Sequence, residues 1–109
     1  MTTYSRALPE AMGYTVTLDE FAGEKMFVRR DDRPHMRDIW NPKDDAGQND
    51  EVQCWLLWQK RTHIDHNGVT VWHSNDILIC DIDHTNTPAS LRAAIVEAAE
   101  RVADAKGDK

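Results

Sequence analysis

The segment Arg61–Trp72 reads RTHIDHNGVTVW and carries the strongest signal for the fold. At its centre, Asn67 and Gly68 separate two runs in which apolar and polar residues alternate. Both residues accept the positive φ angles of a type I′ turn, so the pattern predicts a β-hairpin. The cross-strand pairs expected from this turn are His66–Val69, Ile64–Val71 and Thr62–His73.

The neighbouring segments extend the hairpin to a meander. Glu51–Ile64 has apolar residues at most of its even positions, which predicts the longest strand of the chain. Asp76–Ile82 predicts the following strand, with Trp72 opposite Ile77 and Val71 opposite Leu78. These registers place one set of residues on a common face: Val52, Cys54, Leu56, Trp58, Ile64, Val69, Val71, Leu78, Cys80 and Ile82.

The N-terminal part predicts a separate hairpin and a long loop. Tyr14–Leu18 alternates strictly, and Lys25–Arg30 is the expected returning strand. Residues 31–50 are rich in Asp, Pro and Asn, which predicts a loop. Within it, Met36, Ile39 and Trp40 are expected to form a short turn that holds the loop to the body.

The C-terminal part predicts a helix. Thr87 is a suitable N-cap, Pro88 suits the first helical position, and apolar residues recur from Leu91 to Val102 at helical spacing. We therefore expect residues 1–109 to form one α+β domain. Its antiparallel sheet has about five strands, as a hairpin plus a meander, and one amphipathic C-terminal helix packs on one face.

Composition excludes several classes of function. A net charge of -6 argues against direct binding to nucleic acid, which needs clustered basic residues. No apolar run approaches the roughly 20 residues that span a bilayer, so no membrane segment is expected. Cys54 and Cys80 lie inside apolar runs and are expected to be buried, reduced thiols in a cytoplasmic protein.

The sequence shows no catalytic or metal-binding signature, and we expect no cofactor and no enzymatic activity. His63 and His66 are three residues apart on a strand, so they point to opposite faces and cannot share a metal ion with His73. Asp81, Asp83 and His84 are better explained as the polar end of a strand, because no second cluster converges on them.

The second face of the predicted sheet is apolar, with Trp55, Leu57, Trp72, Ile77 and Ile79 at its odd positions. A solvated face should be polar. Either Phe21, Phe27 and the loop at 31–50 cover it, or it is an interface with a partner protein or a second copy of the chain. Together with Trp40, these residues are the predicted interaction site, and a homodimer is the favoured assembly in isolation.

The segment Trp40–Gln48, WNPKDDAGQ, comes before the meander and the helix that opens Thr87-Pro88. This arrangement resembles a group of small, uncharacterised proteins encoded by tailed phages and prophages. The resemblance implies a phage accessory protein that binds a host protein, for example as an inhibitor of a host or defence factor. A nucleic-acid-associated protein or acidic DNA mimic, and a homodimeric structural protein, are the alternatives.

Overall fold

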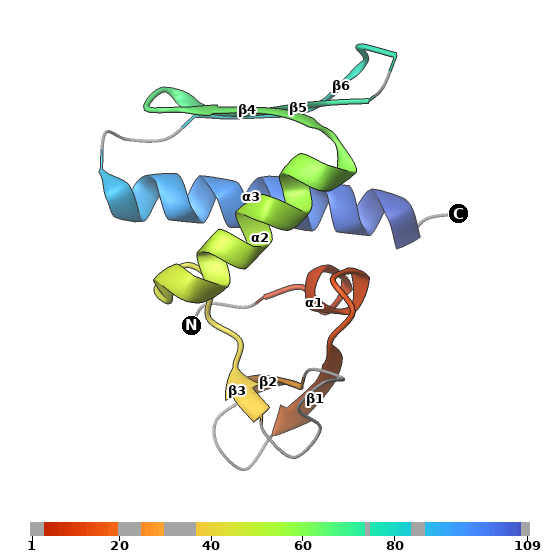
Figure 1. The fold of residues 1–109 in the computed structure, drawn as a ribbon, viewed down its shortest axis with the longest axis vertical. Helices are drawn as coiled ribbons and strands as arrows, with labels where there is room; N and C mark the ends of the chain where they lie inside the picture. Colours follow the sequence, from red (N-terminus) through yellow and green to blue (C-terminus); the bar gives the residue numbers. More distant parts are fainter. Residues whose placement is uncertain (1–3, 20–24, 30–36, 74, 84–86, 108–109) are drawn as a thin grey trace.

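The central feature of the computed structural model is the helix α3, which has other elements on both sides (Figure 1). The structure describes residues 4–19, 25–29, 37–73, 75–83 and 87–107. In chain order the elements are α1 (Ala7–Ala11), β1 (Thr15–Asp19), β2 (Lys25–Arg29), β3 (Arg37–Ile39), α2 (Ala46–Gln59), β4 (Arg61–Asp65), β5 (Gly68–Trp72), β6 (Leu78–Asp83) and α3 (Pro88–Gly107).

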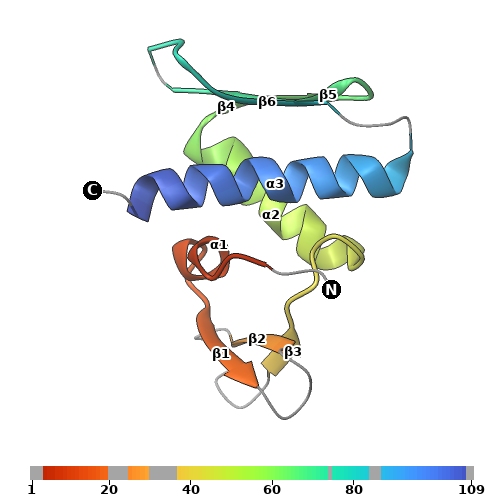
Figure 2. The same ribbon diagram turned by 180° about the vertical axis from the view of Figure 1, so that it is seen from behind.

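The α+β class, the antiparallel strands and the C-terminal helix are confirmed. The prediction of about five strands in one sheet is wrong, because the described strands form two three-stranded sheets, β1-β2-β3 and β4-β5-β6. The sheet β4-β5-β6 covers α3 on one side, whereas α1 and the sheet β1-β2-β3 lie on the other (Figures 1 and 2).

Helix α3 begins where the sequence predicts. The Thr87 hydroxyl accepts a hydrogen bond from the Ser90 N–H at 3.2 Å, which satisfies one of the unpaired amides of the first turn. The helix is buried over more than one stripe, because β5 and β6 contact it on one side and α1 and α2 on others. Most of its fully covered residues are small: Ala94, Ile95, Val96, Ala98, Ala99, Val102 and Ala103.

The predicted strand Glu51–Ile64 is wrong, since α2 occupies most of it and β4 only the end. Helix α2 starts at Asp45, whose carboxylate accepts a hydrogen bond from the Gln48 N–H at 3.0 Å. Asn49, Val52 and Leu56 are buried at the spacing of three and four residues that defines one helix face. Cys54 therefore lies on the exposed side, contrary to the prediction that it is buried.

Helix α2 is fixed to its surroundings by the buried side chain of Asn49. Its amide nitrogen donates hydrogen bonds to the carbonyl oxygens of Pro42, at 2.9 Å, and Arg92, at 3.2 Å. The turn before α2 and the start of α3 are thereby held against the same helix.

The predicted hairpin between β4 and β5 is present, but its register differs. Asp65 pairs with Gly68, so His66 and Asn67 form the turn instead of Asn67 and Gly68. The Asp65 carboxylate accepts hydrogen bonds from the N–H groups of Asn67, at 2.7 Å, and Gly68, at 3.2 Å. The observed pairs are Ile64–Val69 and Thr62–Val71 in place of Ile64–Val71 and Thr62–His73.

A β-bulge changes the register between β5 and β6. Val71 pairs with Cys80, whereas Trp72 pairs with Leu78, so Ile79 is an extra residue on β6. The predicted pairs Val71–Leu78 and Trp72–Ile77 are therefore wrong. Four residues of the predicted core face are buried near α3: Val69, Val71, Cys80 and Ile82.

The N-terminal hairpin is confirmed by the antiparallel pairing of β1 and β2, and β3 adds a third strand. Part of the expected loop at 31–50 is therefore strand β3 and the start of α2. Of the predicted turn, Met36 lies outside the described residues and Ile39 ends β3. Trp40 is only 2% exposed and packs against the Tyr14 ring, with 5.9 Å between ring centroids.

Candidate interaction surface

The polar side chains of the meander do not converge on a chemical centre. Among the described residues, no group of three or more His, Cys, Asp or Glu is placed to hold a metal ion. His63 Nε2 lies 2.8 Å from Asp65 Oδ2, which is a neighbour on the same face of β4. The Asp81 carboxylate accepts a hydrogen bond from Thr70 at 3.2 Å, and His84 lies outside the described residues.

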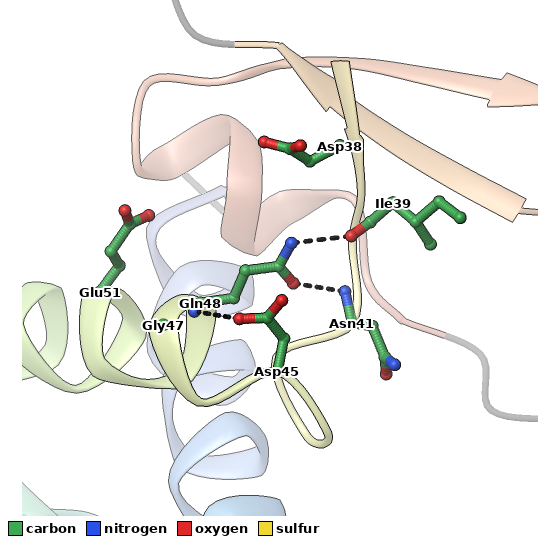
Figure 3. Close-up of a pocket in the computed structure, with 7 residues that line it drawn as sticks. All are labelled: Asp38, Ile39, Asn41, Asp45, Gly47, Gln48 and Glu51. Atoms are coloured by element: carbon green, nitrogen blue, oxygen red, sulfur yellow. Dashed lines mark hydrogen bonds between the residues drawn. The ribbon is translucent and has the colours of Figure 1, made fainter. Parts of the chain in front are cut away.

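A hollow of about 560 Å³ lies between the end of β3 and the first turns of α2 (Figure 3). Gln48 is at its centre and joins the two elements, donating to the Ile39 carbonyl at 2.7 Å and accepting from the Asn41 N–H at 2.6 Å. Asp45 caps α2, and Glu51 accepts a hydrogen bond from the Tyr14 hydroxyl. The polar groups of this hollow thus hold β3 and β1 to α2, which is a structural role.

The predicted interaction site does not form a single sheet face. Trp55 and Leu57 belong to α2, whereas Trp72 and Ile79 belong to the meander, and the alternation that grouped them does not apply to a helix. Trp40 is buried, and Trp55 and Ile79 are partly buried against the core. Of the six predicted residues, Leu57 and Ile77 are largely exposed, at 49% and 58%.

The β-bulge creates one exposed apolar group at the end of the meander. Because Leu78 pairs with Trp72, it shares the outer face of the sheet with Trp72 instead of facing α3 with Cys80. Leu78 is 53% exposed, and Ile77 precedes it in the turn. We call Trp72, Ile77 and Leu78 the Trp72 patch.

Arg61 holds the indole of the Trp72 patch in place. Arg61 pairs with Trp72 across the strands, and its guanidinium carbon lies 4.8 Å from the centroid of the indole ring. The same guanidinium forms an ion pair with Asp76 at 2.5 Å. The patch thus combines the exposed side chains of Ile77 and Leu78 with a partly buried indole that has a guanidinium over its ring.

A second exposed apolar group ends helix α2. Trp58 is 88% exposed and Leu57 is 49% exposed, and we call these two residues the Trp58 patch. Trp58 comes three residues before Arg61, and both patches lie at the end of the molecule where α2 leads into β4 (Figure 1).

The charged groups next to the Trp72 patch are mainly carboxylates. Asp76, Asp81 and Asp83 are exposed in the β5–β6 connection and on β6. On β4, the hydrogen bond from His63 and the amides of the turn hold the pKa of Asp65 below its usual value, so this carboxylate remains charged. The carboxylates near the patch are thus Asp76 and Asp81, whereas Asp65 and Asp83 both pair with Gly68 at the opposite end of the sheet.

Trp58 and Leu78 were missed because the sequence assigned both to the buried face. A signal for α2 was present: Asp45 followed three residues later by Gln48 is typical of a helix start. The bulge at Ile79 leaves no such signal, since β6 reads as an ordinary run of apolar residues.

The described loops do not cover the Trp72 patch. Phe27 and the described part of residues 31–50 lie with the sheet β1-β2-β3 and α2, while Phe21 lies outside the described residues. The sheet β1-β2-β3 is on the far side of α3 (Figure 2).

Among the described helices, none is long and apolar enough to cross a membrane. Comparison with known proteins found no matching family model, no matching curated protein and no matching solved structure.

Proposed function

We propose that this chain is a small, non-enzymatic phage or prophage accessory protein that binds a host protein in the cytoplasm through the Trp72 patch. The supporting observation is the bulge at Ile79, which turns Leu78 outward beside Trp72. Bulges are designed features that re-aim side chains, and an exposed apolar group of this kind marks interaction sites.

The patch has the composition of a binding hot spot. Trp and Arg are enriched among residues that dominate binding energies, and here an indole and a guanidinium are already stacked. Because Asp76 adjoins the apolar centre and Asp81 lies next to Leu78 on the outer face of β6, the partner should offer an apolar pocket with Lys or Arg at its rim. Blocking such a pocket on a host or defence factor would make the chain an inhibitor.

The DNA-mimic alternative receives less support. A mimic needs two rows of carboxylates, but the outer face of the described meander carries Asp65, Asp81 and Asp83 together with Arg61 and His63. Positive and titratable groups therefore interrupt the acidic surface.

The test is affinity capture from a host lysate, followed by titration of the purified partner. Leu78→Asp should weaken binding about 30-fold or more, which corresponds to the roughly 2 kcal/mol of a hot-spot residue. The matched control is Ile39→Asp, which places the same charge at a similarly exposed apolar position, 47% against 53%, on the far side of α3. A partner that binds wild type and both variants equally would contradict the assignment, as would the absence of any retained protein.

A further inference from the structure

Strand β4 lies at an edge of its sheet and, among the described strands, pairs only with β5. An edge strand presents backbone N–H and C=O groups that can pair with another strand. The charges of β4, whose sequence is RTHID, indicate which strand could pair with this edge.

The five residues of β4 are complementary to a second copy of themselves in antiparallel orientation. If His63 lies opposite His63 of the second copy, Arg61 lies opposite Asp65 at both ends. These residues share the outer face of the sheet, so each end places a guanidinium beside a carboxylate, while Thr62 meets Ile64 on the inner face.

The other edge of the sheet lacks this property. On β6, a two-fold pairing centred on Asp81 or Ile82 places carboxylates directly opposite carboxylates. Like charges in directly opposite positions are destabilising. A pairing centred on Cys80 instead places Asp81 opposite Ile79. Self-pairing is therefore favoured at β4.

The Trp58 patch faces the same side of the molecule as the edge of β4. Helix α3 contacts β5 and β6, whereas α2 contacts β4 and also packs against α3. Helix α2 is therefore displaced from α3 in the same direction as β4 is displaced from β6. Both views show α2 on this side of α3 (Figures 1 and 2). Val52 and Leu56 are buried, and Trp58 lies about 200° around the helix from Leu56, away from α3.

A second copy beside β4 would cover this tryptophan. In the antiparallel arrangement, the Arg61 end of one β4 meets the Asp65 end of the other, where Ile64 faces the helix layer. Trp58 precedes Arg61 by three residues and so lies below that junction. A stable interface buries about 1,200 Å² or more. A Trp side chain contributes about 150–250 Å², so two copies of Trp58 supply a substantial share.

We propose that the chain forms a two-fold symmetric homodimer in which β4 pairs with β4 of a second copy, making a continuous six-stranded sheet, with the Trp58 patches buried beneath the junction. The junction shares Arg61 with the Trp72 patch, where the same guanidinium stacks on the indole and pairs with Asp76, but the dimer does not depend on the proposed host partner. The two Trp72 patches would lie on one outer face, so the dimer would present two identical binding sites.

The first test is light scattering over a range of concentrations. The expected mass is 25 kDa, twice the 12.5 kDa of one chain. Arg61→Glu places like charges at both ends of the junction and should raise the dissociation constant about tenfold or more. Arg6→Glu, an equal charge change at the exposed residue before α1, should leave it unchanged. Trp58→Gln should also weaken the dimer, and it keeps a second variant available if Arg61→Glu does not fold.

The second test locates the axis by cross-linking. Directly opposite residues of antiparallel strands have Cα atoms about 4.5–5.5 Å apart, which suits a disulfide. In a Cys54→Ser background, His63→Cys should form a covalent dimer under mild oxidation. Thr70→Cys is the control, because Thr70 pairs with His63 one strand further from the edge. A wild type that stays monomeric, a mass unaffected by both variants, or equal cross-linking at both positions would overturn the proposal.

Discussion

At the scale of single residues, Gly68 shows how a correct signal can give an incorrect register. Asn67-Gly68 correctly predicts a hairpin, yet the Asp65 carboxylate binds the amides of both residues and moves the turn to His66 and Asn67. Gly68 is nevertheless required, because its φ of 156° is one that residues with a side chain rarely adopt. A Cβ atom at this position would lie 2.3 Å from the Ile82 carbonyl oxygen, because β5 lies between β4 and β6. The sequence shows which residues can form a turn, but it does not show that the backbone of β6 lies so close to Gly68.

Gly68→Val should lower the free energy of unfolding by about 1–3 kcal/mol, as expected for overpacking against a rigid backbone. Asn67→Ala is the matched control. Among the described residues other than glycine, Asp76 alone has a positive φ, so Asn67 needs no special conformation and its replacement should change stability by less than about 0.5 kcal/mol. Thermal melts of both variants test whether His66 and Asn67 or Asn67 and Gly68 form the turn. A large loss of stability in Asn67→Ala would support Asn67 and Gly68.

At the scale of elements, the helices differ in how well the sequence predicts them. Thr87, Pro88 and the spacing of apolar residues identify α3, and its observed start agrees. In α2, Val52 and Leu56 fit both a strand face and a helix face, so periodicity alone does not decide. Residues 51–64 contain the end of α2 and the first residues of β4, with one residue between the two elements. Their apolar positions were therefore interpreted together as one strand.

The contact between α1 and α3 should depend on pH through Glu100. Its carboxylate accepts a hydrogen bond from the Ser5 N–H at 2.6 Å, and burial raises the pKa of Glu100 above its ordinary value of 4.5. A raised pKa means that the folded state holds the proton more tightly than the unfolded state. The cost of burying the charge is therefore absent below pH 4.5 and develops as the pH rises through the folded-state pKa.

Glu100→Gln keeps an oxygen acceptor for Ser5 and removes the charge, so it should raise the melting temperature at pH 7 and change it little near pH 4. Melts across this range provide the measurement. Glu97→Gln, an exposed change in the preceding turn, should lack the pH-dependent difference. A decrease for Glu100→Gln at pH 7 that disappears near pH 4 would contradict this prediction, because it would show that the charged carboxylate stabilises the fold.

At the scale of the whole molecule, the two sheets do not pair with each other: α3 packs against β5 and β6 on one side and against α1 and α2 on others, and α1 in turn contacts β1. Local patterns predict strands and hairpins, but whether hairpins share one sheet depends on how α3 is packed. Its alanines allow neighbours to approach from both sides, and the sequence showed only one stripe. The prediction of a single sheet was wrong for this reason, whereas Trp55 and Trp72 were placed on one face because the segment of α2 was predicted as a strand.

Ala98→Leu should therefore weaken both halves together. Ala98 is fully buried, and the added volume should lower the free energy of unfolding by about 1–3 kcal/mol. Circular dichroism and tryptophan fluorescence should show one transition with a common, lowered midpoint. Ala105→Leu, at an exposed position of the same helix, should leave the midpoint near that of wild type. Two separate transitions would mean that the sheets unfold independently.

The position of α3 also affects how the chain folds during synthesis. Helix α3 is the element that packs between the others, yet it follows all of them along the chain. A ribosome adds residues at about 5–20 per second, so the 20 residues of α3 take about 1–4 s to make. The inner faces of β5 and β6 pack against α3, so Val69, Val71 and Ile82 cannot reach their buried positions until this last helix has been made.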